Sequence, residues 1–512
     1  MKKIDKLIVT NKLALKDKYD KDTSKVISLL KSLVDSDRQR GLNSILVFVD
    51  DVEQMKRLKV NVKVTSAINQ RLNKNAIDLL NQRCSPDYIM IFGAADIVPQ
   101  IELLNPLYQP NDDTDKHVKS DLPYACDAAF SKDISNFLSP TRVVGRLPDI
   151  HGVKDLKYVK KIIDTVNKFK SQPAQTYKSY FAISAHVWLA STQMSVKNIF
   201  ESNNWLQEVP SAGPNWSTQQ LSAMSHFVNC HGSPQDSHWY GQKGNNYPVS
   251  VSAAQIDGKI MIGTIAAAEC CYGAQLFDPG TVDSIKPICN TYFANGAVAF
   301  LGSSTIAYGP ASGNEQADLI TQSFLSSIIW SGASSGRALL EARHKYILNH
   351  GPDLSPTDLK TIAQFNLLGD PSVHPVEMAS TTTIKGQSKD FMKEFYSENG
   401  RSERRKYLVS KGNSLKTFAN KIVRDKKIKV TSNSKKEIHE ILRQLKVKTR
   451  EGISFKVRQN AANKKTFDKS PEANARYHVF SEMKQGNPFS HTLTSFKELG
   501  GKVVNVKHYV RK

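Results

Sequence analysis

The sequence has no long apolar run. Nowhere do about 18 apolar residues follow one another, and the most apolar stretches, 260–271 and 296–302, have the length of buried strands. The basic start Met1–Lys6 is followed by Leu7-Ile8-Val9, which is far too short for the apolar core of a signal peptide. We therefore expect no transmembrane segment, no export and a cytoplasmic location.

Cysteine is scarce as well. The 512 residues include six cysteines, and none has the paired CxxC spacing of a zinc ribbon. So few cysteines in so long a chain do not form a disulfide framework, and we expect free thiols in a reducing compartment.

The sequence also lacks GxxxxGK[ST] and a strand-linked GxGxxG, so nothing supports nucleotide hydrolysis or dinucleotide binding. We expect no cofactor and no metal.

The charge lies almost entirely in the last quarter of the chain. Residues 381–512 contain 32 Lys and Arg against 12 Asp and Glu, which accounts for +20 of the net +22. Phe455, Tyr477 and Tyr509 are interleaved with these cations, as surfaces that bind nucleic acid require. The asymmetry predicts an anionic partner, namely nucleic acid, a nucleotide or another anionic ligand. An acidic protein and a merely solvated basic surface remain alternatives.

Length and hydrophobic pattern predict three units, because 512 residues are too many for one core. Continuous β-branched runs alternate with helical patterns, which is typical of parallel sheets covered by helices. We expect an α/β unit over residues 1–165, a second over 166–378 and a small basic α+β domain over 385–512. A polar linker is expected at 379–383, and the last unit should contain a helix that a capping box opens at Ser434.

Two apolar strands of the second unit end on reactive side chains. One leads into His231-Gly232, and the other leads into Cys270-Cys271. The carboxyl ends of neighbouring parallel strands converge on one crevice, so a His and a Cys delivered there can meet. A thiol with a pKa of about 8.5 needs such an imidazole to form the thiolate. The N–H groups of Gly232 and Cys270 are candidate oxyanion donors.

These motifs resemble a clan of cysteine peptidases. A strand ending in His-Gly-Ser and a strand ending in Cys-x-x-Gly are similar to the pair found in gingipains, legumains, caspases and CHAT proteases. Segments 144–148, 302–306 and 368–372 resemble the gingipain branch in particular. The resemblance covers residues 5–378. It implies a caspase-like catalytic domain behind a prodomain-like α/β unit, and a cysteine endopeptidase acting on proteins or peptides.

The resemblance assigns His231 as the general base and Cys270 as the nucleophile, because Gly273 lies three positions after it. Cys271 has the caspase spacing and is the alternative. Successive strand residues point to opposite faces, so only one thiol should face His231. A zinc site made of Cys230, His231, Cys270 and Cys271 is the chemical rival, but adjacent ligand pairs rarely suit tetrahedral geometry.

In the gingipain branch the stretch after Ser304-Thr305 lines the pocket for the residue before the scissile bond. The resemblance therefore makes Ser304, Thr305 and Tyr308 the expected substrate-binding residues. The stretch here reads Ile306-Ala307-Tyr308-Gly309-Pro310, out of register with the family's pattern, so specificity for basic residues is not implied. Glu269 either steers the nucleophile or caps its strand.

Two functions follow as expectations. Peptidases of this clan that stay inside bacterial cells often act as switches, so the resemblance implies a regulated peptidase in a bacterial defence or cell-death pathway. The alternative is a catalytically idle caspase-like scaffold whose basic C-terminal domain binds nucleic acid or an anionic ligand.

Overall fold

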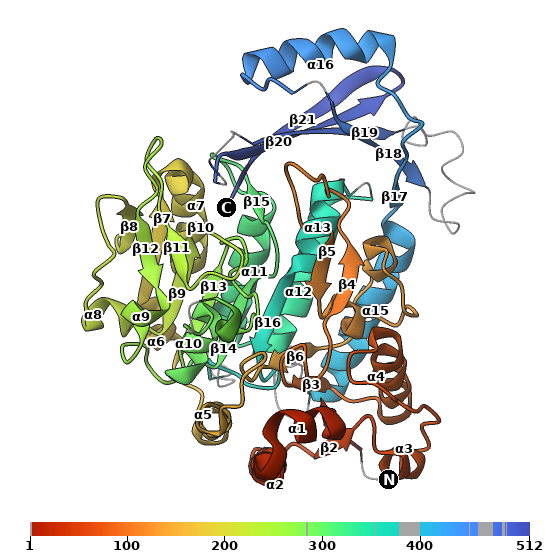
Figure 1. Ribbon diagram of the computed structural model, residues 1–512, viewed down its shortest axis with the longest axis vertical. Helices are drawn as coiled ribbons and strands as arrows, with labels where there is room; N and C mark the ends of the chain where they lie inside the picture. The colour runs from red at the N-terminus through yellow and green to blue at the C-terminus, as the bar shows by residue number, and fades with distance from the viewer. Residues whose placement is uncertain are drawn as a thin grey trace, which may run out of the picture.

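A mostly parallel ten-stranded sheet forms the centre of the molecule, and a separate antiparallel sheet lies at the top of the view in Figure 1. This computed structural model describes residues 3–512 except 283–284, 353, 378–399, 450, 459–474, 484–486 and 488. The predicted α/β architecture is confirmed. The predicted linker at 379–383 lies outside the described residues.

The strands of the large sheet are short apolar runs whose residues are mostly buried, as expected for strands covered on both faces. In spatial order they are β2 (Ser44–Phe48), β1 (Lys6–Thr10), β3 (Tyr88–Phe92), β6 (Val144–Leu147), β16 (Phe365–Gly369), β14 (Ala299–Ser303), β13 (Ile265–Ala268), β9 (Ser225–Asn229), β7 (Tyr180–Ala185) and β8 (Leu206–Val209). Neighbours run parallel except β14 and β16, which are antiparallel. Strands β13, β9 and β7 therefore end at the same edge.

The sheet is continuous across the expected boundary near residue 165. Strand β6 of the first predicted unit pairs with β16 of the second, at Arg146 and Leu368. The two α/β units thus share one sheet, and their division into separate domains stays a prediction.

Helices cover both faces of the sheet. One row contains α7 (Leu189–Phe200), α11 (Ala317–Ser331), α12 (Ser335–His350) and α15 (Arg401–Phe418); the other contains α2 (Thr23–Gln39), α5 (Leu156–Lys168), α10 (Ile288–Ala294) and α9 (Ala253–Ile256). Strand β9 shows the alternation, because Asn229 bonds to Thr192 of α7 while His226 contacts Tyr292 of α10.

Shorter elements complete the body, which we define as residues 3–377. The helices are α1 (Lys12–Tyr19), α3 (Val52–Arg57), α4 (Gln70–Cys84), α6 (Ala174–Lys178), α8 (Thr218–Leu221) and α13 (Pro356–Gln364). The strands are β4 (Ile101–Leu104), β5 (His117–Ser120), β10 (His231–Gly232), β11 (His238–Tyr240), β12 (Val249–Ser252) and β15 (Tyr308–Gly309). Strands β10, β11 and β12 form a small antiparallel sheet that continues from the end of β9.

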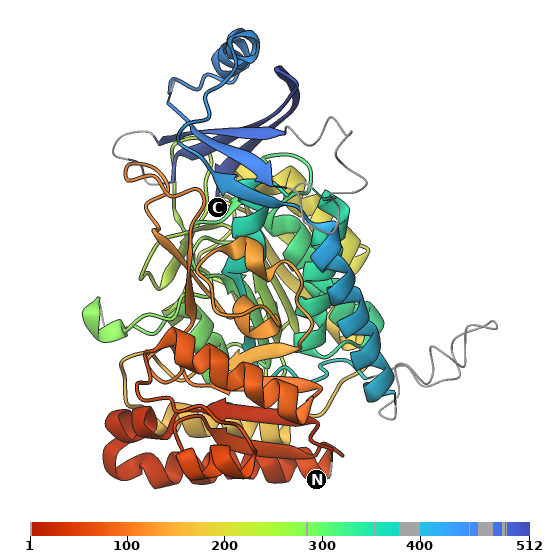
Figure 2. The ribbon, with the colours of Figure 1, turned by 90° about the vertical axis from the view of Figure 1, so that its right-hand side faces the viewer.

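We define residues 400–512 as the C-terminal module. After α15 come β17 (Lys421–Arg424), α16 (Ser432–Gln444), β18 (Ile453–Arg458), β19 (Arg476–Met483), β20 (His491–Leu499) and β21 (Lys502–Arg511). The strands form an antiparallel sheet with α16 packed on it (Figures 1 and 2). Helix α16 begins earlier than expected, because the Thr431 side chain accepts the N–H of Ser434 and caps the helix in its place.

The sheet of the C-terminal module extends into the body. Its edge strand β21 pairs with β15, so the module's sheet includes two residues of the body. In Figure 1 the C-terminus accordingly lies next to β15, inside the outline of the body. This pairing brings the end of the chain to the carboxyl edge of β13 and β9.

Candidate active site

His231 begins β10, just beyond the end of β9, and is fully buried. Its Nε2 lies 2.7 Å from Oε1 of Gln242, whereas its Nδ1 has no hydrogen-bond partner among the described residues. The ring packs between Trp188, at 4.5 Å between centroids, and Phe489, at 4.9 Å. A neutral ring that donates from Nε2 to Gln242 keeps its Nδ1 lone pair available for a thiol proton.

The imidazole is held in its neutral form. Burial lowers the pKa of His231 to about 3, and the positive charges of Arg511 and Lys512 act in the same direction against the opposing hydrogen bond from Gln242. In this arrangement the ring is therefore unprotonated at neutral pH, which is the state that a general base requires.

The Cys270 thiol points into the core. Its Sγ lies 3.9 Å from the carbonyl oxygen of Val228, on the face of the sheet where Tyr292 of α10 packs. Burial raises the pKa of Cys270 well above its ordinary value, and the neighbouring Cys230 adds to the rise. These surroundings favour an inert thiol.

Cys271 lies one residue further on and has different neighbours. Its Sγ accepts a hydrogen bond from the N–H of Ala307 at 3.2 Å, and its own N–H donates to the carbonyl oxygen of Lys512 at 3.2 Å. Burial raises the pKa of this thiol, but the Arg511 guanidinium opposes the rise. A Cβ on Gly232 would lie 1.8 Å from the Cys271 carbonyl oxygen, so only glycine allows the His231 strand to pass this close.

Lys512 occupies a buried polar pocket. Its Nζ contacts Oδ1 of Asn229 at 3.1 Å and forms ion pairs with Glu269 and Asp318. Neither Lys512 nor either carboxylate is exposed to solvent. The pocket wall includes Gly309, because a Cβ there would lie 2.1 Å from Cε of Lys512.

The buried groups of the pocket shift one another's pKa values. Although burial alone would lower the pKa of Lys512, the carboxylates of Asp318 and Glu269 raise it. Burial and the nearby Asp318 raise the pKa of Glu269 well above its usual range. Lys512 therefore has two buried acidic partners, as a cation removed from solvent requires.

The residues before Lys512 lie along β15 as an added strand. Arg511 pairs with Tyr308 and Val510 with Gly309 in antiparallel register, and the Lys512 N–H donates to the Ala307 carbonyl oxygen at 3.0 Å. This is the geometry of peptide recognition by strand addition, in which main-chain bonds hold the peptide and pockets select its side chains.

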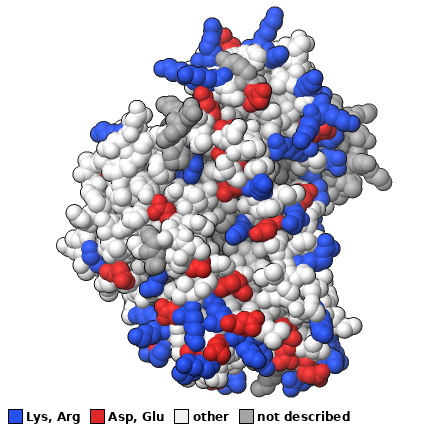
Figure 3. Space-filling view, in the orientation of Figure 1, with Lys and Arg blue, Asp and Glu red and all other residues white. Residues whose placement is uncertain are grey.

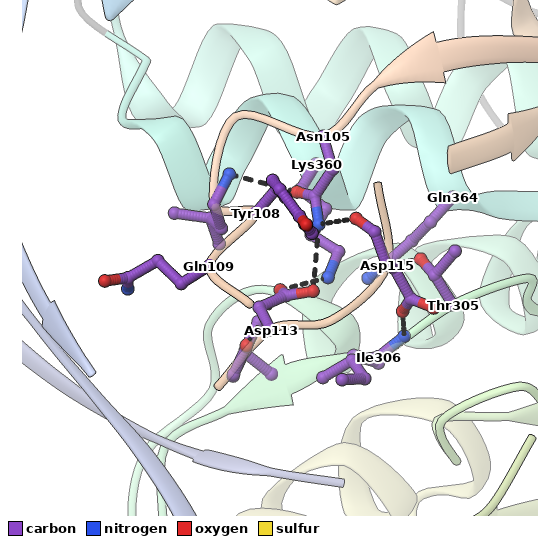
Figure 4. A network of polar contacts seen from close by, with 12 residues as sticks. Asn105, Tyr108, Gln109, Asp113, Asp115, Thr305, Ile306, Lys360 and Gln364 are labelled. Atoms are coloured by element: carbon purple, nitrogen blue, oxygen red, sulfur yellow. Dashed lines mark hydrogen bonds and ion pairs between the residues drawn. The ribbon is translucent and has the colours of Figure 1, made fainter. Parts of the chain in front are cut away.

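A loop from the first predicted unit supports β15. Asp115 accepts the Ile306 N–H at 2.9 Å, and Asp113 pairs with Lys360 (Figure 4). Asp113 also accepts the hydroxyl of Tyr308 at 2.9 Å. Burial raises the pKa of Asp115, with Lys360 opposing the rise. The N-terminal part of the chain thus fixes the segment that contacts Cys271.

The three predicted substrate-binding residues make different kinds of contact. Ser304 donates to the carbonyl oxygen of Lys119 at 2.7 Å, and Thr305 donates to Oε1 of Gln364 at 2.9 Å, so both side chains hold their own loop. Tyr308 instead pairs through its backbone with the added strand. The assignments of these three residues, of Cys270, and of the Gly232 and Cys270 oxyanion donors stay predictions.

Sequence reasoning missed most of the pocket. Asn229 lies two residues before His231 at a strand end, which could have marked it. Asp318 opens α11, and Lys512 is 243 positions from Glu269, so no local pattern connects them. Only the folded chain brings these groups together.

No group of three or more His, Cys, Asp or Glu is placed to hold a metal ion in the part of the chain that the structure describes. Among the same residues, no helix has both the length and the apolarity needed to cross a membrane.

The model of peptidase family C25 matches residues 2–376. The chain belongs to this family. It is therefore a cysteine peptidase, and the resemblance to gingipains is confirmed. No curated protein matches the chain. A solved structure described as "Structure of Protease" is 12% identical, covers 100% of this chain and 98% of its own, and superposes with a TM-score of 0.48, which is too low to support an argument.

Proposed function

We propose that this member of family C25 is an endopeptidase that uses His231 and Cys271 and cleaves after lysine. One observation carries the proposal. The carbonyl oxygen of Lys512 accepts the Cys271 N–H while its ammonium group lies between Glu269 and Asp318. A substrate lysine bound in the same way presents its carbonyl carbon to the Cys271 thiol.

The proposed chemistry is that of a thiol nucleophile and an imidazole base. The Cys271 thiol gives its proton to Nδ1 of His231, and the thiolate attacks the carbonyl carbon of the peptide bond. The carbonyl oxygen, now negative, is stabilised by the Cys271 N–H. The imidazolium returns the proton to the leaving amine, and water, deprotonated by His231, hydrolyses the thioester. The thiol and the neutral imidazole are regenerated.

The pocket suits lysine better than arginine. An ammonium group has three N–H donors, and Asn229, Glu269 and Asp318 offer oxygen acceptors around one point. A planar guanidinium is larger and needs a fork of acceptors. An uncharged side chain would leave the two carboxyl groups without their cation.

A covalent probe tests the nucleophile. We expect a peptidyl-lysine acyloxymethyl ketone to label the full chain at Cys271, as located by peptide mass mapping. Cys271→Ala should abolish labelling and Cys270→Ala should retain it. Labelling that depends on Cys270 would restore the nucleophile predicted from the spacing to Gly273. A folded chain that reacts at neither cysteine, even when Lys512→Ala empties the pocket, would favour the idle scaffold.

Two further proposals concern the cellular role of the peptidase and the ligand of its C-terminal module. The regulated role in a bacterial defence or cell-death pathway, inside the cytoplasm, rests on the resemblance to gingipain-like and caspase-like switches. The anionic ligand of the C-terminal module, whether nucleic acid, a nucleotide or another anion, rests on charge. Lys and Arg gather over that module in Figure 3, and α16 exposes Lys435, Lys436 and Arg443. Binding that weakens steeply with salt would support this proposal.

A further inference from the structure

The C-terminal module contacts both proposed catalytic residues. Its last residues cover Cys271, whose N–H is bonded to Lys512 and whose thiol lies beside Arg511. A second segment places Phe489 against the His231 ring, with 4.9 Å between centroids. The two contacts come from the open end of the β20–β21 hairpin, one just before β20 and one just after β21, so the same end of the module covers both proposed catalytic residues.

The covering segment leaves no room for a substrate. Lys512 is fully buried and Arg511 is only 5% exposed, so the pocket and the groove along β15 are filled. Every acceptor that the proposed substrate lysine requires already bonds to Lys512. A second peptide can reach Cys271 only after these residues have left.

Other contacts hold the module in place. Tyr509 donates to Glu315 at 3.0 Å and accepts from Gln316 at 3.1 Å, and Lys507 forms an ion pair with Glu315 at 3.0 Å. On the far side of the module, Ser481 donates to Asp112 at 2.9 Å. The module is therefore docked through the last residues of β21 and through β19, and its end does not enter the site as a loose tail.

We propose that the C-terminal module is a built-in inhibitor, in which residues 510–512 occupy the substrate groove and must withdraw before peptides are cleaved. The inference rests on the proposed function, because it takes Cys271 and the lysine pocket as the working site. A tethered segment acts at an effective concentration on the order of mM, so a free substrate at micromolar concentration competes poorly. An activating partner works by binding the withdrawn state more tightly than the docked one.

The test compares two lysines at the two ends of β21, Lys502 at its start and Lys512 just after its last residue. Lys512→Ala removes the group that fills the pocket, whereas Lys502→Ala removes an exposed lysine at the start of β21. We expect Lys512→Ala to react with the peptidyl-lysine probe at least about tenfold faster than the unaltered chain, and Lys502→Ala to react at the original rate. Thermal melting establishes that each variant is folded. If Lys512→Ala does not fold, Lys512→Met keeps the volume of the side chain without its charge.

The outcomes separate this inference from the proposed function. Equal, rapid labelling of the unaltered chain and Lys512→Ala would overturn the inference and leave the peptidase intact. A folded Lys512→Ala chain that is never labelled would overturn the proposed function itself. A slow unaltered chain beside a fast Lys512→Ala chain supports both.

A peptide added in trans gives a second measurement. A synthetic peptide with the sequence of residues 505–512 should inhibit the Lys512→Ala chain, because it can fill the groove along β15. The same peptide with Glu in place of its final Lys should not inhibit, since a carboxylate cannot lie beside Glu269 and Asp318. Equal inhibition by both peptides would contradict occupation of the lysine pocket.

Discussion

The body and the C-terminal module contrast in how they carry charge. Residues 1–380 are almost neutral, yet they bury Glu269 and Asp318 together. Residues 381–512 carry a net charge of +20, yet the cations that reach the site are the buried Arg511 and Lys512. Lys435 and Lys436 of α16 lie in solvent, where water screens them. Burial therefore decides which charges interact strongly, because two charges at a given distance attract each other far more strongly away from water.

We expect the largest effect from replacing His231, which the body contributes to the proposed site. In the Lys512→Ala chain, His231→Ala should lower the rate of peptide cleavage by about 10²–10⁴-fold, because it removes the general base. The control is His226→Gln, which changes a buried histidine on the α10 face of β9, the strand that precedes His231. Steady-state cleavage of a lysyl-aminocoumarin peptide measures both. Equal losses would mean that His231 has only a structural role.

We expect the next largest effect from removing the negative charge of Asp318 in the lysine pocket. In the same Lys512→Ala chain, Asp318→Asn should lower kcat/KM for lysine substrates by about 10²-fold or more, since losing one partner of a buried ion pair costs about 3–5 kcal/mol. A peptide with norleucine before the scissile bond serves as the internal control, and its kcat/KM should not fall. A parallel loss with both substrates would show that Asp318 supports the fold and does not select the substrate.

Buried titratable groups in the body should also appear in the pH dependence of stability. Burial lowers the pKa of His344 to about 4, against an unfolded value of 6.5. Its contribution is therefore present above pH 6.5 and is lost as the pH falls toward 4, because only the unfolded chain binds the proton there. The unfolding free energies of the unaltered chain and His344→Gln should converge by about 2 kcal/mol between pH 6.5 and pH 5.

Urea titrations at several pH values measure this convergence. Between pH 7.5 and pH 8.5 the difference should stay constant, because the histidine is neutral in both states. A difference that also stays constant down to pH 5 would mean that His344 is not buried in its neutral form.

The smallest effect concerns the exposed charges of the module. Replacing Lys435 and Lys436 by Ala should reduce the salt dependence of duplex DNA binding by a log–log slope of about 1–2, with little change in stability. Lys12 and Lys25, which are exposed on the body, serve as the matched pair of control replacements. Fluorescence anisotropy at several salt concentrations measures the slope. An equal reduction from both pairs would show that the basic module has no special role in binding.

Local sequence patterns predicted the framework of the fold because they depend on neighbouring residues. Apolar runs such as Tyr88–Phe92 form the strands, and the strand ends deliver His231 and the Cys270-Cys271 pair to one edge of the sheet. The start of α16 was misjudged by a few residues, because Thr431 and Ser434 are both good caps and only the packing of the helix selects between them.

The sequence by itself determined the α/β framework, the membership of a cysteine peptidase family and the location of the positive charge. Only the tertiary structure decided which thiol lies beside β15 and where Lys512 lies. Strand alternation turns Cys270 toward α10, while the turn after β13 brings Cys271 to β15. The pairing of β15 with β21 then places Lys512 among Asn229, Glu269 and Asp318. Contacts between segments so far apart in the chain leave no local pattern, because they form only when the sheets assemble.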